Sequence, residues 1–231
     1  MKKAAKFALI KTIPIFLGYL FLGIAFGLLL QKSGLGVFWA FLISTLVYAG
    51  SMQFALVGIL TGGLSYVTTA VMTLFINSRH AFYGLTFIER FKEMRKTYPY
   101  MVFSLTDETY SLLCSMARPS DFTDREWKAA TFFTSFFDQC YWIAGSVLGA
   151  LMGELITFDT TGIDFAMTSL FTVIFVEQWQ STKCHIPALM GLAAAAVSLA
   201  ILGPDNFILP AMLAICVMLV AMRGRLAKEV A

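Results

Sequence analysis

Polar and charged side chains interrupt hydrophobic runs that are otherwise long enough to cross a bilayer. They fall within five short strings: Tyr48–Phe54, Asn77–His80, Thr106–Thr109, Asp138–Gln139 and Glu177–Gln178. A charged side chain at membrane depth costs about 2.5 to 3.5 kcal/mol even on permissive insertion scales, so pairing, water or a bound substrate must offset it. This pattern is typical of a membrane transporter.

The string from Asn77 to His80 gives the sharpest signal. Arg79 offers a planar, two-pronged donor for a carboxylate and does not lose its proton cheaply. His80 can relay protons near neutral pH. The alternative is that Arg79 snorkels at a helix end and that His80 is a polar anchor at the membrane boundary.

Two acidic residues stand side by side in the string Thr106–Thr109. Adjacent helical positions are about 100° apart, so Asp107 and Glu108 are not expected to face the same direction. One of them would face a cavity, where it binds a substrate ammonium, pairs with Arg79 or titrates during proton coupling. The alternative, compatible with this role, is that Thr106 or Asp107 caps a helix that starts at a break.

The string Tyr48–Phe54 combines backbone freedom with hydrogen-bonding side chains. Gly50 tolerates unusual backbone angles, while Ser51 and Gln53 can bond freed backbone groups or a ligand. A helix that restarts here would present its amide N–H groups to a carboxylate. The alternative is small-residue packing between helices, although burying Gln53 without a partner is costly.

The later strings occupy corresponding places in the second half of the chain. We expect Asp138 and Glu177 to complete a charge network with Arg79, with Asp138 the deeper of the two. The alternative for Glu177 is that it marks the end of a span. The candidate residues for substrate binding or coupling are Gly50, Ser51, Gln53, Asn77, Arg79, His80, Asp107, Glu108, Asp138, Gln139 and Glu177.

Composition indicates a polytopic membrane protein. Of the 231 residues, 58% are hydrophobic and only 13% are charged, against about 25% charged in a typical soluble domain. The net charge of +3 reflects membrane topology rather than nucleic-acid binding. The four cysteines are scattered, and no disulfide framework, metal pair, phosphate loop or catalytic motif is present. We therefore expect no enzyme activity, no cofactor and no metal.

The elements that must position these residues are helices. Hydrophobic runs fall at 12–30, 37–60, 64–88, 98–117, 129–156, 163–178, 186–202 and 207–222. They predict an all-α fold with seven or eight transmembrane segments. If all eight cross, the charge bias favours a cytoplasmic N-terminus and C-terminus but leaves the basic segment Arg90–Lys96 outside. A re-entrant segment would remove this conflict, and the best candidates are 37–60, broken at Gly50–Ser51, and 98–117, broken at Asp107–Glu108.

The hydropathy also hints at a duplication within a single transmembrane domain, residues 1–231. The halves would be 12–88 and 98–180, followed by two further spans within 186–222. Three spans in each half would orient the halves oppositely, as in the 3+3 inverted repeats whose broken helices form a substrate site.

Five strings taken together resemble the AzlC family of branched-chain amino-acid exporters. They are LGYLFLGIAFG from Leu17, YAGSMQFALVG from Tyr48, NSRHAFYG from Asn77, LTDETYSL from Leu105 and DFAMTSLF from Asp164. Their order and spacing match the family over most of the first 180 residues.

The resemblance implies a plasma-membrane permease that exports branched-chain or similar apolar amino acids, driven by an ion gradient. It also implies a small AzlD-like membrane subunit as partner, besides the amino-acid substrate and the lipid bilayer. Two other classes remain open on the residues alone. The same polar groups would line an ion- or proton-conducting pore, or the chain would be a non-transporting scaffold for its small partner.

Overall fold

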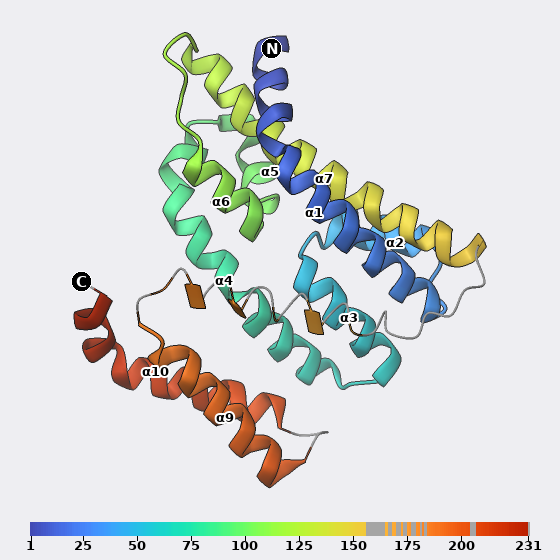
Figure 1. Cartoon of the computed structure of the whole chain (residues 1–231), viewed down its shortest axis with the longest axis vertical. Coiled ribbons are helices and arrows are strands. Elements are labelled where there is room, and N and C mark those ends of the chain that lie inside the picture. The colour runs from blue at the N-terminus through green and yellow to red at the C-terminus, as the bar shows by residue number, and fades with distance from the viewer. Residues whose placement is uncertain are drawn as a thin grey trace. The chain divides into compact units, whose positions relative to one another are not determined.

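The computed structural model describes residues 1–155, 184–203 and 207–230 and, between them, residues 165, 168, 169, 172, 175, 176, 179, 180 and 182 (Figure 1). Within these residues the regular elements are helical, and no strand occurs, which confirms the all-α prediction. The elements are α1 (Lys2–Lys32), α2 (Val37–Leu46), α3 (Gly50–Gly62), α4 (Tyr66–Lys92), the 3-10 turn η1 (Arg95–Thr97), α5 (Tyr98–Phe103), α6 (Asp107–Ser115), α7 (Asp124–Leu155), α9 (Ile186–Leu202) and α10 (Ile208–Val230).

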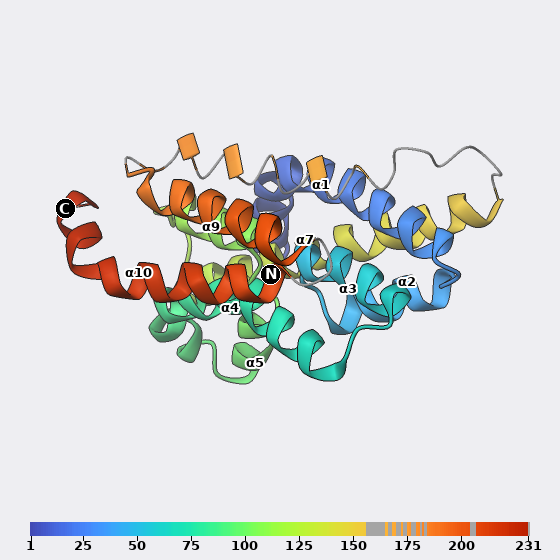
Figure 2. The same cartoon turned by 90° about the horizontal axis from the view of Figure 1, so that it is seen from below.

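The described residues divide into two compact units. One unit contains Met1–Gly63 and Ile76–Met167, and the other contains Leu64–Phe75 and Thr168–Ala231. In the second unit α9 and α10 pack side by side, as both views show (Figures 1 and 2). The grouping of the whole chain as one transmembrane domain stays a prediction.

Helix α1 is apolar along most of its length. Its 31 residues correspond to about 46 Å at 1.5 Å per residue, more than a hydrocarbon core of about 30 Å requires. Among the described residues it is the one helix both long and apolar enough to cross a membrane, while α2, α3 and α9 are apolar but shorter.

Helices α1 and α7 form the scaffold of the first unit and run parallel, side by side, along most of their lengths (Figure 1). Glycines make this approach possible. A Cβ atom at Gly27 would lie 2.1 Å from the carbonyl oxygen of Ser146, and one at Gly149 would lie 2.1 Å from that of Ile24. The two backbones are therefore in direct contact, as in close-packed membrane helix pairs with small residues at the interface.

Helices α2 and α3 form a hairpin instead of one continuous helix. The chain leaves α2 after Leu46 and enters α3 at Gly50, with Tyr48 in the left-handed region at φ 40°. Trp39 near the start of α2 and Leu60 near the end of α3 line a common cavity with Ser33, which follows α1. Both open ends of the hairpin therefore lie beside the C-terminal end of α1. A break within residues 37–60 is therefore present, but it covers Val47–Ala49, and Gly50 and Ser51 begin α3 instead of interrupting a helix.

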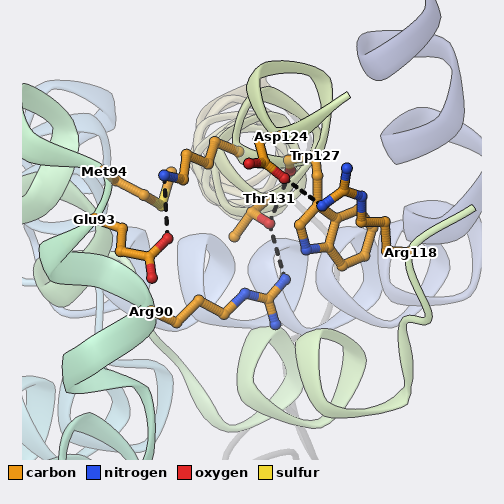
Figure 3. Close-up of a pocket in the computed structure, with 8 residues that line it drawn as sticks. Arg90, Glu93, Met94, Arg118, Asp124, Trp127 and Thr131 are labelled. Carbon is orange, nitrogen blue, oxygen red and sulfur yellow. Dashed lines mark hydrogen bonds and ion pairs between the residues drawn. The ribbon is translucent and has the colours of Figure 1, made fainter. Parts of the chain in front are cut away.

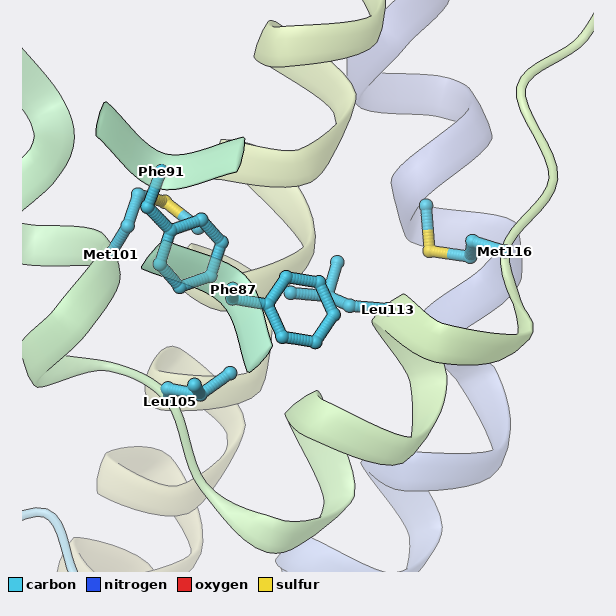
Figure 4. Close-up of a cluster of buried hydrophobic side chains, with 6 residues drawn as sticks. All are labelled: Phe87, Phe91, Met101, Leu105, Leu113 and Met116. Carbon is cyan, nitrogen blue, oxygen red and sulfur yellow. The ribbon is translucent and has the colours of Figure 1, made fainter. Parts of the chain in front are cut away.

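Helices α5 and α6 form a second, shorter hairpin. Six buried side chains hold it against the last turns of α4 (Figure 4): Phe87, Phe91, Met101, Leu105, Leu113 and Met116. The break covers Ser104–Thr106, so Asp107 opens α6 instead of interrupting it. With six and nine residues, these helices measure about 9 and 14 Å, too short for either to cross a bilayer alone.

The basic segments of the first unit gather at one end of the scaffold. Lys3 pairs with Asp121 at 2.8 Å, and Lys128 pairs with Glu93 at 3.1 Å. The N-terminus of α1, the segment after α4 and the start of α7 therefore meet. This arrangement removes the conflict of an eight-crossing chain, in which Arg90–Lys96 lay opposite the N-terminus.

Helix α7 begins at this basic end through a capping box. Thr123 Oγ1 accepts from the Glu126 amide at 3.3 Å, and Glu126 Oε2 accepts from the Thr123 amide at 3.0 Å. The reciprocal pair satisfies two amides that the helix leaves open. The Thr123 amide and, after it, the Thr123 hydroxyl, which donates to Glu126 Oε2 at 3.0 Å, lower the pKa of the Glu126 carboxyl.

Two predictions remain without a test. The run 163–178 lies largely outside the described residues, so the sixth segment is not assigned. The 3+3 inverted repeat, which depends on that segment, stays a prediction, as does the total number of spans.

Candidate functional site

The tips of the two hairpins meet near the middle of the α1–α7 scaffold. The rings of Tyr48 and Phe103, one from each tip, lie 6.3 Å apart. Half-way along α7, Gln139 connects the hairpins: its amide Nε2 donates to the Thr45 carbonyl at 3.3 Å, and its Oε1 accepts from the Tyr100 hydroxyl at 2.8 Å. Most candidate residues from the sequence surround this junction.

Arg79 on α4 joins the same two hairpins through charge. Its Nη1 lies 2.5 Å from Asp107 Oδ2 at the start of α6, and its Nη2 donates to Ser51 Oγ in the first turn of α3. The side chains of Arg79 and Asp107 are each 26% exposed, so this ion pair is only partly buried. His80 Nε2 lies 3.7 Å from Asp107 Oδ1, too far for a hydrogen bond.

Glu108 faces away from Asp107, as the spacing of adjacent helical residues predicts. Its Oε2 accepts from the Tyr19 hydroxyl of α1 at 2.8 Å. The same hydroxyl lies 2.6 Å from Thr106 Oγ1, which also accepts from the Thr109 amide at 3.3 Å. Thr106 is therefore the N-cap of α6, and the acidic first turn of that helix complements its dipole.

Asp138 on α7 is the most deeply buried acid of the site. Its side chain is 0% exposed, and its Oδ2 accepts from the Thr109 hydroxyl at 2.8 Å. Within the described part of the chain, its other oxygen has no hydrogen-bond partner and no cation lies within ion-pair distance. The predicted charge network between Asp138 and Arg79 is therefore wrong for the described residues, because the neutral Thr109 faces Asp138.

Gln53 is fully buried and its amide is bonded within the protein. Its Oε1 accepts from the Trp142 indole N–H at 2.9 Å and from the Ala49 amide at 3.2 Å, and its Nε2 donates to Ser44 at 3.1 Å. These contacts fix the α2–α3 hairpin and bind its tip to α7. A Cβ atom at Gly50 would lie 3.3 Å from the Trp142 ring, so glycine permits this close approach.

The structure thus brings together most of the predicted residues. The pairing of Arg79 with an acid is confirmed, and Gly50, Ser51, Gln53, Asp138 and Gln139 share the junction. Asn77 lies on α4 with its Oδ1 buried and unbonded among the described residues. Glu177 lies outside the described residues.

Sequence reasoning missed several neutral members of the site. Tyr19 lies in an apolar run of α1 with no polar neighbour to mark it. Thr109 and Trp142 also gave no charge signal, although each is buried and donates to a candidate residue. Among the described residues, no cluster of three or more His, Cys, Asp or Glu is arranged to hold a metal.

The fold and this site define a helical protein whose charged and hydroxyl-bearing side chains meet where two short helical hairpins touch. The AzlC protein family model matches residues 14–156, which include both hairpins and all of α7. The chain belongs to the AzlC family.

Individual relatives agree with this assignment. The branched-chain amino acid transport protein AzlC of Bacillus subtilis strain 168 is 38% identical over 217 residues, 94% of this chain and 84% of that protein. An uncharacterized membrane protein of Helicobacter pylori strain J99 is 37% identical over 97% of each chain. The inner membrane protein YgaZ of Escherichia coli K12 is 24% identical over 79% of this chain and 77% of its own. No solved structure matches the chain. These relatives support a membrane location.

Proposed function

We propose that the chain exports branched-chain or similar apolar amino acids across the cell membrane, driven by an ion gradient and together with a small AzlD-like subunit. The observation that carries this proposal is the contact of Arg79 with Asp107 and Ser51 at the junction of two broken helices. The relative from Bacillus subtilis, named as a branched-chain amino acid transport protein, supports the substrate class.

The site suits a zwitterion because it already contains both complementary charges. The substrate carboxylate binds the guanidinium of Arg79 in the bidentate geometry that arginine favours. The substrate ammonium binds Asp107, whose Oδ2 lies 2.5 Å from Arg79 Nη1. The amide N–H groups at the start of α3 add positive potential for the carboxylate. Neighbouring aromatic side chains, including Tyr48 and Phe103, accept the apolar side chain.

The coupling ion in this proposal is a proton carried by Asp138. A fully buried carboxylate with one hydrogen bond from a neutral hydroxyl is costly to keep ionised. Its Oδ1 has no hydrogen-bond partner among the described residues and can therefore carry the proton. Thr109 and Thr106 connect Asp138 to Glu108 and Tyr19 through hydrogen bonds. A change in the protonation of one acid therefore alters the hydrogen bonds of the other through these hydroxyl groups.

The basic end of the first unit lies on the cytoplasmic side in this proposal. The segments 2–11, 90–96 and 118–128 that meet there contain eleven Lys or Arg and four Asp or Glu, as the positive-inside bias requires. The α5–α6 hairpin then enters from the cytoplasm and the α2–α3 hairpin from outside. The N-terminus is cytoplasmic, and we also propose a cytoplasmic C-terminus.

The test is efflux of labelled leucine, isoleucine and valine from cells that express the chain with and without the small subunit. We expect efflux only with both chains. Arg79→Gln and Asp107→Asn should abolish efflux at normal membrane levels, because each leaves one end of the zwitterion unbound. Lys92→Gln, which removes an exposed cation from the same helix, should leave efflux unchanged.

Three outcomes would overturn parts of the proposal. Normal efflux by both site variants would refute the assigned roles of Arg79 and Asp107. Saturable efflux from the small subunit alone would favour the scaffold class. An ion conductance that does not depend on amino acid, without any efflux, would favour the pore class.

A further inference from the structure

A polar cavity lies at the basic end of the first unit, away from the hairpin junction. It has a volume of about 320 Å³, within the range of small-ligand sites. Its walls come from the end of α4, the segment before α7 and the first two turns of α7 (Figure 3). The lining residues are Arg90, Glu93, Met94, Arg118, Asp124, Trp127, Lys128 and Thr131.

Two of the three cations in this cavity already have an acidic partner. Lys128 pairs with Glu93 at 3.1 Å, and Arg118 pairs with Asp124. Arg90 does not: within the described part of the chain no carboxylate lies within ion-pair distance of its guanidinium. The cavity therefore has one positive charge without a counter-ion.

The guanidinium of Arg90 is held in place by neutral groups. It lies over the rings of Phe87 and Trp127, at 5.4 and 5.1 Å from their centroids. Its Nη2 donates to Thr131 Oγ1 at 2.9 Å, and its Nη1 donates to the Leu113 carbonyl at 3.3 Å. Ring contacts and neutral acceptors orient the cation without cancelling its charge, so an anion that enters the cavity meets a preorganised guanidinium.

We propose that this cavity binds the phosphate of an anionic phospholipid headgroup. A guanidinium is well suited to phosphate because it donates two parallel hydrogen bonds. The surrounding segments contain eleven basic and four acidic residues, and basic pockets at the cytoplasmic ends of membrane helices favour anionic headgroups. Trp127 lines the cavity, and tryptophan prefers the headgroup level. This inference does not depend on the transported substrate.

The test is native mass spectrometry of the full-length, detergent-purified chain titrated with phosphatidylglycerol or with phosphatidylcholine of the same acyl chains. We expect phosphatidylglycerol to bind more tightly to the wild-type chain. Arg90→Gln should weaken its binding about tenfold, as the loss of a charge-assisted contact predicts. Lys92→Gln is the matched control, because Lys92 belongs to the same turn of α4 but does not line the cavity.

A gain-of-affinity variant keeps the test valid if the Arg90 variant fails to fold. Glu93→Gln removes an acid from the cavity and frees Lys128, so phosphatidylglycerol should bind several-fold more tightly. Glu89→Gln removes an exposed acid one turn earlier, outside the cavity, and should have little effect.

Four results would overturn the proposal. Equal losses in the Arg90 and Lys92 variants would show only a general attraction to the basic surface. Equal gains in the Glu93 and Glu89 variants would show the same. No preference for phosphatidylglycerol over phosphatidylcholine would exclude an anionic headgroup. Displacement of the lipid by millimolar inorganic phosphate would identify free phosphate as the ligand.

Discussion

The glycine seam between α1 and α7 gives the sharpest quantitative prediction. A Cβ atom at Gly27 would lie 2.1 Å from the Ser146 carbonyl oxygen and 2.5 Å from the Ala150 amide nitrogen. Both neighbours are backbone atoms, so no side chain can rotate away. Ordinary contact begins at 3.4 Å, and Gly27→Ala must therefore move one helix by about 1.3 Å. Gly18, on the same helix, has nothing within 4 Å of a Cβ position and supplies the matched control.

The expected cost follows from these distances. Overpacking costs about 1 to 3 kcal/mol, and an immovable backbone places Gly27→Ala near the upper limit. The higher helix propensity of alanine offsets up to about 1 kcal/mol of this cost. The free energy of unfolding should therefore fall by about 2 kcal/mol. For a chain of this size the unfolding midpoint should fall by about 4 to 8 °C.

The measurement is thermal unfolding of the two purified variants in the same detergent, followed by tryptophan fluorescence. Gly18→Ala should match or slightly exceed the wild-type midpoint, since it gains helix propensity without a clash. If Gly27→Ala unfolded within about 1 °C of Gly18→Ala, the backbone-to-backbone seam would be refuted. Leucine efflux at matched membrane levels would then show whether the seam also supports function.

The same thermal assay checks three further residues. Trp142→Phe removes the indole donor to Gln53 and should lower the midpoint by about 2 to 4 °C, the effect of about 1 kcal/mol per lost hydrogen bond; an unchanged midpoint would contradict that bond. Thr106→Val removes the N-cap of α6 and should cost a similar amount, with Thr106→Ser as the control that restores the midpoint. The hydrogen bond from Lys3 lowers the pKa of the exposed Asp121 carboxyl in the folded chain. The contribution of this contact to stability is therefore present above the ordinary aspartate pKa of about 3.9 and is lost as the pH falls through the lowered pKa of the folded state. The small difference in midpoint between the wild type and Asp121→Asn should therefore be present at pH 7 and disappear in acid, and a difference that persisted in acid would refute this sign.

Charge and periodicity made part of the site predictable from the sequence. Arg79 and Asp107 stood out because an unpaired charge inside an apolar run is costly, and each was expected to find the other type of charge. Their ion pair confirms that reasoning. The orthogonal directions of Asp107 and Glu108 followed from helical spacing alone.

Neutral partners were not predictable, because an uncharged side chain does not stand out in an apolar run. Tyr19 and Trp142 cost little in an apolar run, so their presence gives no signal, yet each donates to a candidate residue. The predicted charge network between Asp138 and Arg79 was wrong because the prediction assumed that a buried acid is stabilised by an opposite charge. A buried hydroxyl from Thr109 serves Asp138 instead, and only the fold shows which neutral group is near.

The hairpins were predictable only in outline. Gly50 indicated a first break, but the unusual backbone lies at Tyr48, with φ 40°, and Gly50 is the first residue of α3. At the second break the acids were expected to interrupt the helix, but Thr106 caps it and Asp107 begins it. Capping and interruption use the same residue types, so the sequence pattern did not separate them.

Under the proposed transport function, the two kinds of contact in the first unit predict which parts move. Across the α1–α7 seam the backbones touch because Gly27 and Gly149 have no Cβ atom, and sliding would bring the side chains of other residues against the opposite backbone. The hairpin tips are held by side chains instead: Gln139 bridges them through two hydrogen bonds, and Arg79 through an ion pair and one hydrogen bond. Such bridges break by rotation of one side chain, and the zwitterionic substrate of the proposed function would replace the ion pair with its own two charges. The hairpins are therefore the elements whose separation the substrate can favour, while α1 and α7 remain fixed as one scaffold.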